Sequence, residues 1–444
     1  MAEKHEIAEL GEVRSDGADH RDEAALARVG KKTVLKRKFG FLAILGFSCT
    51  VLVTWEGFLV LFLVGLQNGG PAGVFYGYLI TWLGTTSVFA VLSELVSMAP
   101  TSGGQYHWVA MLAPPRYQKV LSYIAGWLTV AGWQATIASC SYLTASLVQG
   151  ILVLTQPNYT PHNWHATILF WAIIAFAVVI TTGANWLLPM FEAIILFIHI
   201  AGFLGIIVPL LAMGPHENAH DVFTTFINRG GWDTQGLSFC IGMMGTVYAF
   251  VGGDGAIHMA EEIQNAPVTV PRAIMTGVSS HTSIPVNAVA ATTVIAIILS
   301  FVNIGSATAF NGVISVAIAG IFSSYLLVSS LLLYRRVTGG IISLQDLEDH
   351  PNLTNTTGKL LSWGPWCIPG ALGIANNAFA CAYLSFVFFF TFWPSVKDVQ
   401  PANMNWSILV TGVITIFSGL YYVISARKTY TGPIIEIGTE ETPN

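Results

Sequence analysis

Apolar runs of twenty residues or more recur along this chain, and no other feature limits its fold as strongly. A helix of about 20 apolar residues crosses the roughly 30 Å hydrocarbon layer of a bilayer. Membrane-spanning β-barrels show short segments of alternating polarity instead. Of the 444 residues, 53% are hydrophobic and 10% are charged, which leaves too few polar groups to cover a soluble fold. We therefore expect an all-α polytopic membrane protein.

The apolar runs predict about ten spans. They lie near residues 40–66, 71–98, 120–154, 166–184, 190–213, 236–260, 284–303, 308–334, 372–394 and 404–426. Residues 1–38 are polar and mixed in charge, so we expect a disordered cytoplasmic tail there. A transmembrane domain over 39–427 and a second cytoplasmic tail over 428–444 complete the predicted organisation.

Lysine and arginine are distributed unevenly between the predicted loops. If the N-terminus is inside and the spans alternate, only Arg229 and Lys397 fall outside. The positions that fall inside are Lys31, Lys32, Lys36, Arg37, Lys38, Arg116, Lys119, Arg272, Arg335, Arg336, Lys359, Arg427 and Lys428. Because cytoplasmic loops carry the excess of these residues in membrane proteins, we predict that both termini are cytoplasmic.

The predicted span 236–260 contains an acidic residue among glycines, in the run Phe250-Val-Gly-Gly-Asp-Gly-Ala256. Each glycine costs a helix about 1 kcal/mol. Unpaired backbone groups at membrane depth are tolerated only where protein or a wet cavity surrounds them, and a carboxylate at that depth usually marks function. We expect a helix broken at a substrate site around Asp254. The alternative is a packing kink with Asp254 near the interface.

The first span is also interrupted near its middle, in the run Phe47-Ser-Cys-Thr-Val-Leu-Val-Thr-Trp-Glu-Gly57. Small hydroxyl residues, an acid and a glycine replace apolar residues there. Transporters built from inverted repeats carry their broken helices in corresponding places of the two halves, so this span is the predicted partner of the sixth. A helix contact mediated by serine and threonine is the alternative.

Other polar groups in the spans carry weaker predictions. Glu192 and His199 lie two turns apart on one helical face, which favours an internal hydrogen-bonded pair over a proton relay. His258 and Glu261 share a face but are too few ligands for a metal site. Trp133 is expected to be an interfacial anchor. No paired carboxylates, metal cluster or activated nucleophile share a site, so the sequence predicts neither an enzyme nor a cofactor.

Four segments resemble the fungal amino-acid/choline transporter family of the amino acid–polyamine–organocation superfamily, with choline and γ-aminobutyrate (GABA) permeases as the nearest kind. They are Thr54-Trp-Glu-Gly57, the run Ser93-Glu-Leu-Val-Ser-Met-Ala-Pro-Thr-Ser-Gly-Gly-Gln-Tyr-His-Trp108, the run Gly253-Asp-Gly-Ala256 through Glu261-Glu-Ile-Gln-Asn-Ala-Pro267 to Val270-Pro-Arg-Ala-Ile274, and Ser283-Ile-Pro-Val-Asn287. The resemblance covers about residues 38–430.

The resemblance implies an inverted-repeat permease fold in which the broken first and sixth helices bind the charged groups of the substrate. The implied substrate-binding residues are Ser48, Cys49, Thr50, Val51, Thr54, Phe250, Gly252, Gly253, Asp254 and Gly255. Glu56 and Asp254 are the candidate charge-bearing groups. The resemblance further implies a secondary active, proton-coupled carrier of amino acids, choline or GABA, located in the plasma membrane.

The chain departs from the family pattern between Ile274 and Ser283. Family members have about twelve spans, and the residues after Val278 lead directly into the entrance of the ninth family helix. Family helices seven and eight are therefore expected to be missing, which preserves the inside–outside alternation. A second hypothesis follows from this departure: a truncated splice or gene-model product that inserts in the membrane but does not transport.

Overall fold

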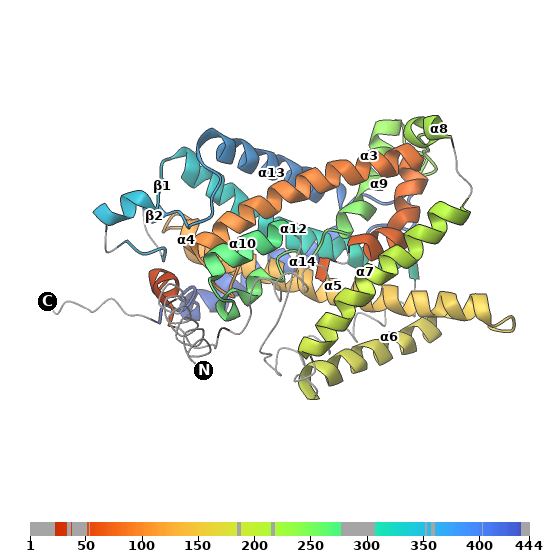
Figure 1. Cartoon of the computed structure of the whole chain (residues 1–444), viewed down its shortest axis with the longest axis horizontal. Coiled ribbons are helices and arrows are strands. Elements are labelled where there is room, and N and C mark those ends of the chain that lie inside the picture. The colour runs from red at the N-terminus through yellow and green to blue at the C-terminus, as the bar shows by residue number, and fades with distance from the viewer. Residues whose placement is uncertain are drawn as a thin grey trace, which may run out of the picture.

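A computed structural model describes residues 23–32, 37, 51–52, 54–183, 188–214, 218–276, 307–350, 353–356, 360–401 and 403–436. The described part is mostly helical, as expected (Figure 1). Its elements are α3 (Thr54–Met98), α4 (Gln105–Leu112), α5 (Gln118–Thr155), α6 (Asn163–Val178), η1 (Val179–Gly183), α7 (Leu188–Met213), α8 (Ala219–Thr224), α9 (Gln235–Tyr248), η3 (Ile257–Glu262), α10 (Ala266–Thr276), α12 (Ala307–Val337), β1 (Ile341–Ile342), η4 (Gln345–Asp349), β2 (Leu361–Ser362), α13 (Gly370–Phe390), α14 (Ser407–Tyr421), η5 (Tyr422–Ala426) and α15 (Arg427–Thr429).

Six helices in the described residues are long and apolar enough to cross a membrane. They are Leu61–Met98, Gln118–Thr155, Asn163–Gly183, Gly312–Val337, Gly370–Phe390 and Ser407–Thr429. The count of about ten spans stays a prediction, because the span expected at 284–303 lies outside the described residues. The span expected at 236–260 corresponds to α9, whose 14 residues are too few to cross a bilayer alone.

Helix α3 joins the two apolar runs expected at 40–66 and 71–98, and it bends sharply between them (Figure 1). The bend lies at Gly70, whose φ of 68° is left-handed, just before Pro71. A side chain at Gly70 would lie 2.7 Å from the amide of Ile227, so only glycine fits this approach. The loop around Ile227 is thereby held against the bend.

The core of the bundle lies where α3, α5, α9, α12 and α13 pack together. Gly132 on α5 and Gly320 on α12 let these two helices approach closely, since a Cβ at Gly320 would lie 2.6 Å from the Cα of Gly132. Small residues permit such close packing of membrane helices. Trp108, Tyr325 and Phe322 are among the largest fully buried side chains around this contact and fill the interior.

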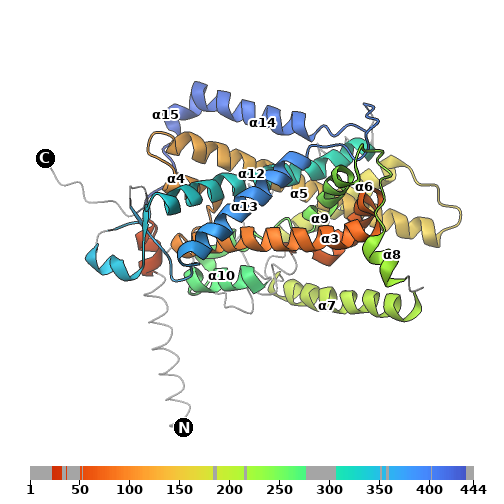
Figure 2. The ribbon, with the colours of Figure 1, turned by 90° about the horizontal axis from the view of Figure 1, so that it is seen from above.

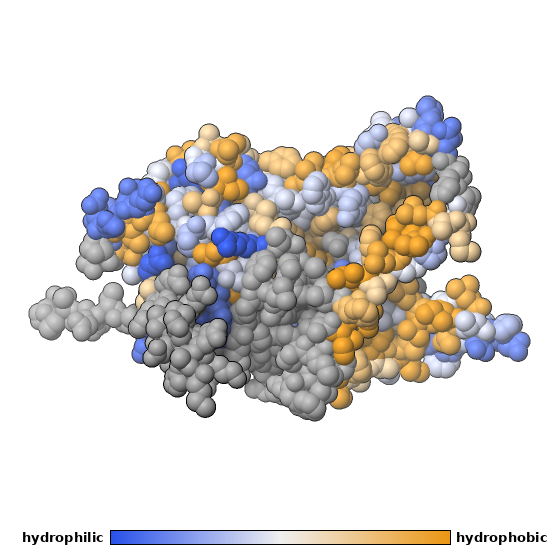
Figure 3. All heavy atoms as spheres, in the orientation of Figure 1, coloured by the Kyte–Doolittle hydropathy of each residue, from blue (hydrophilic) through white to orange (hydrophobic). Residues whose placement is uncertain are grey.

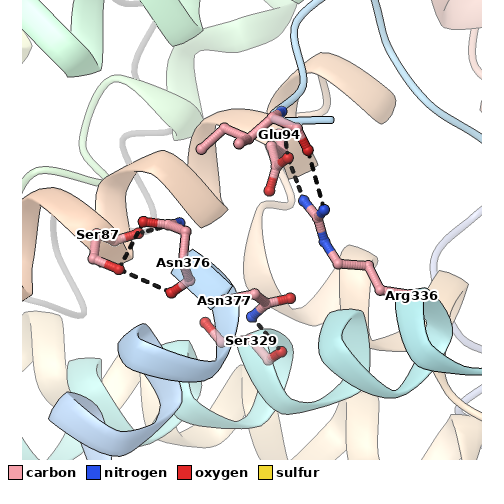
Figure 4. Close-up of polar contacts among 7 residues, drawn as sticks. Ser87, Glu94, Ser329, Arg336, Asn376 and Asn377 are labelled. Atoms are coloured by element: carbon pink, nitrogen blue, oxygen red, sulfur yellow. Dashed lines mark hydrogen bonds and ion pairs between the residues drawn. The ribbon is translucent and has the colours of Figure 1, made fainter. Parts of the chain in front are cut away.

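Polar side chains join α3 to α13 and α13 to α12 within the bundle (Figure 4). The Ser87 hydroxyl donates to the Asn376 side-chain oxygen at 2.9 Å, and the Asn377 amide donates to the Ser329 carbonyl at 3.0 Å. Asn377 and Ser329 are fully buried. Hydrogen bonds of this kind commonly join membrane helices, because few other partners exist in hydrocarbon.

An enclosed ion pair joins the ends of α3 and α12. The side chains of Glu94 and Arg336 are 0% and 4% exposed, and they point toward each other in Figure 4. The Glu94 carboxylate also accepts from the Ile368 amide at 2.7 Å, while the Arg336 guanidinium lies 4.4 Å from the ring centre of Trp363. The segment leading into α13 is therefore fastened to both helices.

The outer helices expose apolar side chains instead of polar ones. Phe197 and Leu211 on α7, Phe176 on α6 and Ile416 on α14 are between 62% and 72% exposed. In Figure 3 the hydrophobic colour is concentrated along α7 and α6, whereas hydrophilic residues gather at the two far ends of the molecule. This distribution suits a protein whose sides contact lipid and whose ends contact water.

Both ends of the described chain meet at one end of the bundle (Figure 2). Residues 23–28 form a short helix in which Leu26 is buried, a feature that the expectation of a disordered tail did not anticipate. Glu436 accepts from the Lys32 backbone amide at 3.0 Å and from the Lys31 ammonium at 3.3 Å. These two donors hold the pKa of Glu436 below its ordinary value.

Candidate functional site

The glycine-rich run after α9 is not helical. Helix α9 begins at the cap residue Thr234, whose hydroxyl accepts from the Leu237 amide at 3.2 Å, and ends at Tyr248. Residues 249–256 form turns, and the 3₁₀ helix η3 follows from Ile257. The helical path is therefore interrupted at the place where the glycine cluster lowers helix propensity.

Two glycines in this run have close neighbours that leave no room for a side chain. Gly252 has φ of 104°, and a Cβ there would lie 3.0 Å from the Val51 carbonyl oxygen. A Cβ at Gly253 would collide with the ring of Phe89 on α3. These contacts bring Val51 and the first residues of α3 against the interruption, so glycine is needed for packing as well as for backbone conformation.

Asp254 lies inside this interruption and is fully buried. Its Oδ2 accepts from the Gln105 side-chain amide at 2.6 Å and from the Trp133 indole N–H at 3.4 Å. The Nε2 of His258 is 3.4 Å from the same oxygen, and the Tyr325 hydroxyl of α12 faces the carboxylate. Four elements thus surround one buried acid, which suits a group whose protonation or ligand matters.

His258 connects this acid to the segment before α4. Its Nδ1 lies 2.9 Å from the Ser102 carbonyl oxygen. The Ser102 amide and hydroxyl both donate to the Glu261 carboxylate at 2.9 Å. Gly104, with φ of 50°, leaves space for the ring, since a Cβ there would lie 2.9 Å from its Cε1. The loop before α4 and the segment 254–261 are therefore joined by paired contacts.

A second acid–histidine pair joins α3 to α7. The Oε1 of Glu56 is 2.6 Å from the Nδ1 of His199 on α7, and the Trp55 indole N–H lies 3.2 Å from the same nitrogen. The two side chains are 31% and 14% exposed, so this pair is only partly enclosed. An apolar cavity of about 520 Å³ opens beside it, lined by Trp55, Phe58 and Phe203 among other apolar residues.

Comparison with known proteins shows what kind of bundle this is. The profile of a family described as amino acid permease matches residues 39–282 and 277–414, most of the chain. This chain belongs to the amino acid permease family. It is an integral membrane protein, and the family expected from its motifs is confirmed.

Fungal proteins are among the relatives that this chain resembles. A choline transporter of Saccharomyces cerevisiae is 31% identical over 274 residues, covering 61% of this chain and 47% of the relative. An uncharacterized amino-acid permease of Schizosaccharomyces pombe is 24% identical over 512 aligned positions, covering 94% and 90%. Amino-acid permease 2 of Neurospora crassa is 25% identical, covering 92% and 88%.

The alignments show that some relatives are longer than this chain. The chain spans about half the length of the choline transporter that it matches. The alignment with the S. pombe permease is longer than the 444 residues of this chain, so that relative has residues that this chain lacks. The two matches to the family profile meet at residues 277–282, the junction at which two helices were expected to be missing.

The structure brings together some of the predicted substrate-binding residues. Val51 lies against Gly252, and the Gly255 amide donates to the Gly252 carbonyl at 2.9 Å. Phe250 packs against Tyr78, with ring centres 5.5 Å apart. Glu56 contacts His199 on α7, and no contact between described residues joins it to Asp254. The two candidate charge-bearing groups of the permease therefore have separate surroundings.

Several predicted residues cannot be placed. Ser48, Cys49 and Thr50 lie outside the described residues, as does the side chain of Thr54. The break expected in the first span therefore stays a prediction. The side chain of Glu192 is also outside the described set, so its expected pairing with His199 is untested.

The sequence did not single out most of the residues that surround Asp254. Gln105 belongs to the motif after the second span, but nothing in its spacing connects it to Asp254. Trp133 was expected to anchor the interface, whereas its indole donates to Asp254 inside the bundle. Tyr325 was not considered, although a tyrosine in the middle of an apolar span is a usable signal of a buried polar contact.

Proposed function

We propose that this permease is a secondary active transporter that couples proton movement to the uptake of a small zwitterion or cation: an amino acid, choline or GABA. The observation that carries this proposal is the fully buried carboxylate of Asp254 at the interruption after α9. Its Oδ1 accepts no hydrogen bond of ordinary geometry from the described residues. A buried acid with an unused oxygen suits a proton or a cationic substrate group.

The substrate would lie between two broken helices. Backbone groups of residues 250–255, released from helical hydrogen bonding, would face it from the sixth helix, and residues 48–54 would face it from the first. The close approach of Val51 to Gly252 supports this arrangement. The two helices would occupy corresponding places in an inverted repeat, and transport would proceed by rocking one helix group against another.

The charges at the two ends of the bundle support a cytoplasmic location for both termini. Lys31 and Lys32 lie at the end where the described termini meet. Arg229 and Lys397 lie together at a different loop cluster, where the Lys397 amide donates to the Gly230 carbonyl at 2.8 Å. Because cytoplasmic loops carry most lysine and arginine, we place the first end inside the cell. The plasma membrane is the proposed location.

The expected lack of two family helices makes transport by this 444-residue chain the point to be tested. The division of the family match at residues 277–282 supports that expectation but does not bear on activity. Nothing in the described residues or the comparisons supports the non-transporting product, so we keep it only as an outcome of the experiment.

Uptake by permease-deficient fungal cells tests the proposal. Labelled choline, GABA and amino acids are supplied to cells that express this chain, its Asp254→Asn variant, or a version with the two family helices restored. Asp221→Asn, at an exposed acid of α8, is the matched control. We expect saturable uptake that acid pH stimulates, lost in Asp254→Asn and kept in Asp221→Asn. Uptake only by the restored version would show that this chain inserts without transporting.

A further inference from the structure

The hydrogen bonds of His258 fix which of its ring nitrogens carries a proton. The Nδ1 atom lies 2.9 Å from the Ser102 carbonyl oxygen. A carbonyl oxygen only accepts hydrogen bonds, so Nδ1 must be the donor. A neutral His258 therefore carries its single N–H proton on Nδ1, and its Nε2 has a lone pair and no proton.

That lone pair would face a carboxylate. Nε2 is 3.4 Å from Oδ2 of Asp254, a side chain with no exposed surface. A lone pair opposite an anionic oxygen repels it, and burial removes the water that would screen the repulsion. The contact becomes attractive when one more proton lies between the two groups, either as an imidazolium facing a carboxylate or as a protonated acid facing Nε2.

We propose that Asp254 and His258 together form the binding site for the coupled proton. One proton is bound between Nε2 and Oδ2 and is released as H⁺, with no other bond made or broken. The histidine side chain is 29% exposed, although its Nε2 atom is buried, while the acid has no exposed surface, so the ring is the route that we assign to the proton on its way to Asp254. This inference rests on the proposed transport function and assigns one step of it to named atoms.

The other groups facing the pair do not supply this proton. Gln105 of α4 and Trp133 of α5 donate to Oδ2 and do not titrate. Tyr325 of α12 faces the acid with a phenolic hydroxyl, a group that ordinarily stays protonated near pH 7. Glu261 of η3 is a further acid near the pair, but its carboxylate accepts hydrogen bonds from Ser102 and not from His258. Phe89 of α3 closes the remaining side against Gly253.

Proton binding at this pair would also control the contact between the loop before α4 and the segment 254–261. Ser102 and Gln105 precede and begin α4, whereas Asp254, His258 and Glu261 belong to the segment after α9. Loss of the proton makes Nε2 and Oδ2 repel each other within the segment after α9. Any shift of these two side chains disturbs the hydrogen bonds that they make to Ser102 and Gln105, which hold the two segments together. Proton release is thereby coupled to separation of the loop before α4 from the segment 254–261, the type of step that alternating access requires.

His258→Asn is the variant that isolates this role. The asparagine amide can still donate to Ser102, but no atom at that position titrates near pH 7. The purified 444-residue protein is reconstituted in liposomes, with the labelled choline, GABA or amino acid that the cell assay identifies. Two rates are measured: accumulation driven by an imposed pH gradient, and exchange against the same compound loaded inside. His220→Asn, at an exposed pair with Asp221, is the matched control.

We expect His258→Asn to lose accumulation while keeping exchange, and His220→Asn to keep both. Accumulation by His258→Asn equal to that of the unmodified protein overturns the proton site while leaving the transport function intact. Absence of both activities in the unmodified protein refutes the transport function instead.

A spectroscopic measurement tests the pair whether or not the protein transports. Nitrogen NMR of the reconstituted protein, labelled at histidine, reports the tautomer of each ring. The His258 signals are those that disappear in His258→Asn. We expect a proton on Nδ1 throughout the pH range and titration at Nε2. A neutral ring with its proton on Nε2 overturns the inference, even where the folded His258→Asn variant has lost both transport activities.

Discussion

The two acid–histidine pairs of this permease have the same chemical groups in different surroundings. Asp254 is fully buried, and the side chains of Gln105 and Trp133 together with the Ser102 carbonyl fix the orientation of the pair. Glu56 is 31% exposed and shares one nitrogen of His199 with the Trp55 indole. The partly exposed Glu56 can exchange protons with water directly, whereas the fully buried Asp254 exchanges one only through the His258 ring. Enclosure, rather than residue type, distinguishes a coupling site from a local contact.

The largest expected effect is on stability, and it concerns Glu94, a buried carboxylate whose partner is the arginine Arg336 and not a histidine. Replacing Arg336 by methionine leaves the Glu94 carboxylate buried without its counter-ion. Removal of one partner of a buried ion pair costs about 3–5 kcal/mol. We expect a markedly lower unfolding temperature in detergent. Lys397→Met, which breaks an exposed pair with Asp233, is the control and should change it little.

Replacing Asp254 by asparagine should produce the largest loss of transport that is not explained by unfolding. The variant keeps the size of the side chain but cannot bind the proton. Loss of a charged hydrogen-bond acceptor of this kind is worth about 1.5–3 kcal/mol, or roughly tenfold to a hundredfold. The initial rate of uptake at acid pH measures the effect. Uptake that still responds to the pH gradient would mean that the proton binds elsewhere.

Gln105→Leu sharpens the comparison, because it removes a hydrogen bond to Asp254 and leaves both titratable groups of the pair in place. Its amide donates to Asp254 at 2.6 Å, and leucine removes that donor without adding a charge. We expect uptake to fall about tenfold, with its pH dependence displaced toward higher pH because the charged acid loses a stabilising donor. A lower rate at every pH without this displacement would indicate a structural defect.

The smallest effect is expected at the partly exposed pair. Glu56→Gln removes a charge whose contact with His199 is accessible to water, and pairs of this kind are worth about 0.2–1 kcal/mol. Uptake should fall at most about fivefold, with unchanged pH dependence. If Glu56→Gln abolishes the pH response while Asp254→Asn does not, the roles of the two pairs are the reverse of those proposed.

The helices could be predicted more completely than the contacts between them. The apolar run 120–154 corresponds closely to α5, Gln118–Thr155, because the length of an apolar segment and its helical period are local properties. The glycine cluster likewise predicted an interruption near Asp254. In contrast, the contact between the bend at Gly70 and the loop at Ile227 is one that no local pattern reveals.

The candidate site was predicted only where its residues are neighbours in the chain. Gln105 and Trp133 reach Asp254 across 149 and 121 positions of sequence, so their roles follow from the tertiary fold alone. The spacing of His258 and Glu261 places both on one helical face, where they are too few ligands for a metal site. The proton-holding role of His258 depends on the Ser102 carbonyl, which carries no sequence signature because every residue has one.

The most direct test of the account is the proton influx that accompanies substrate uptake into liposomes, measured in parallel for the unmodified protein, His258→Asn and His199→Asn. The account predicts that substrate drives proton influx through the unmodified protein and through His199→Asn, but not through His258→Asn. Influx that persists in His258→Asn and disappears in His199→Asn would contradict it and would assign the coupled proton to the pair on α3 and α7.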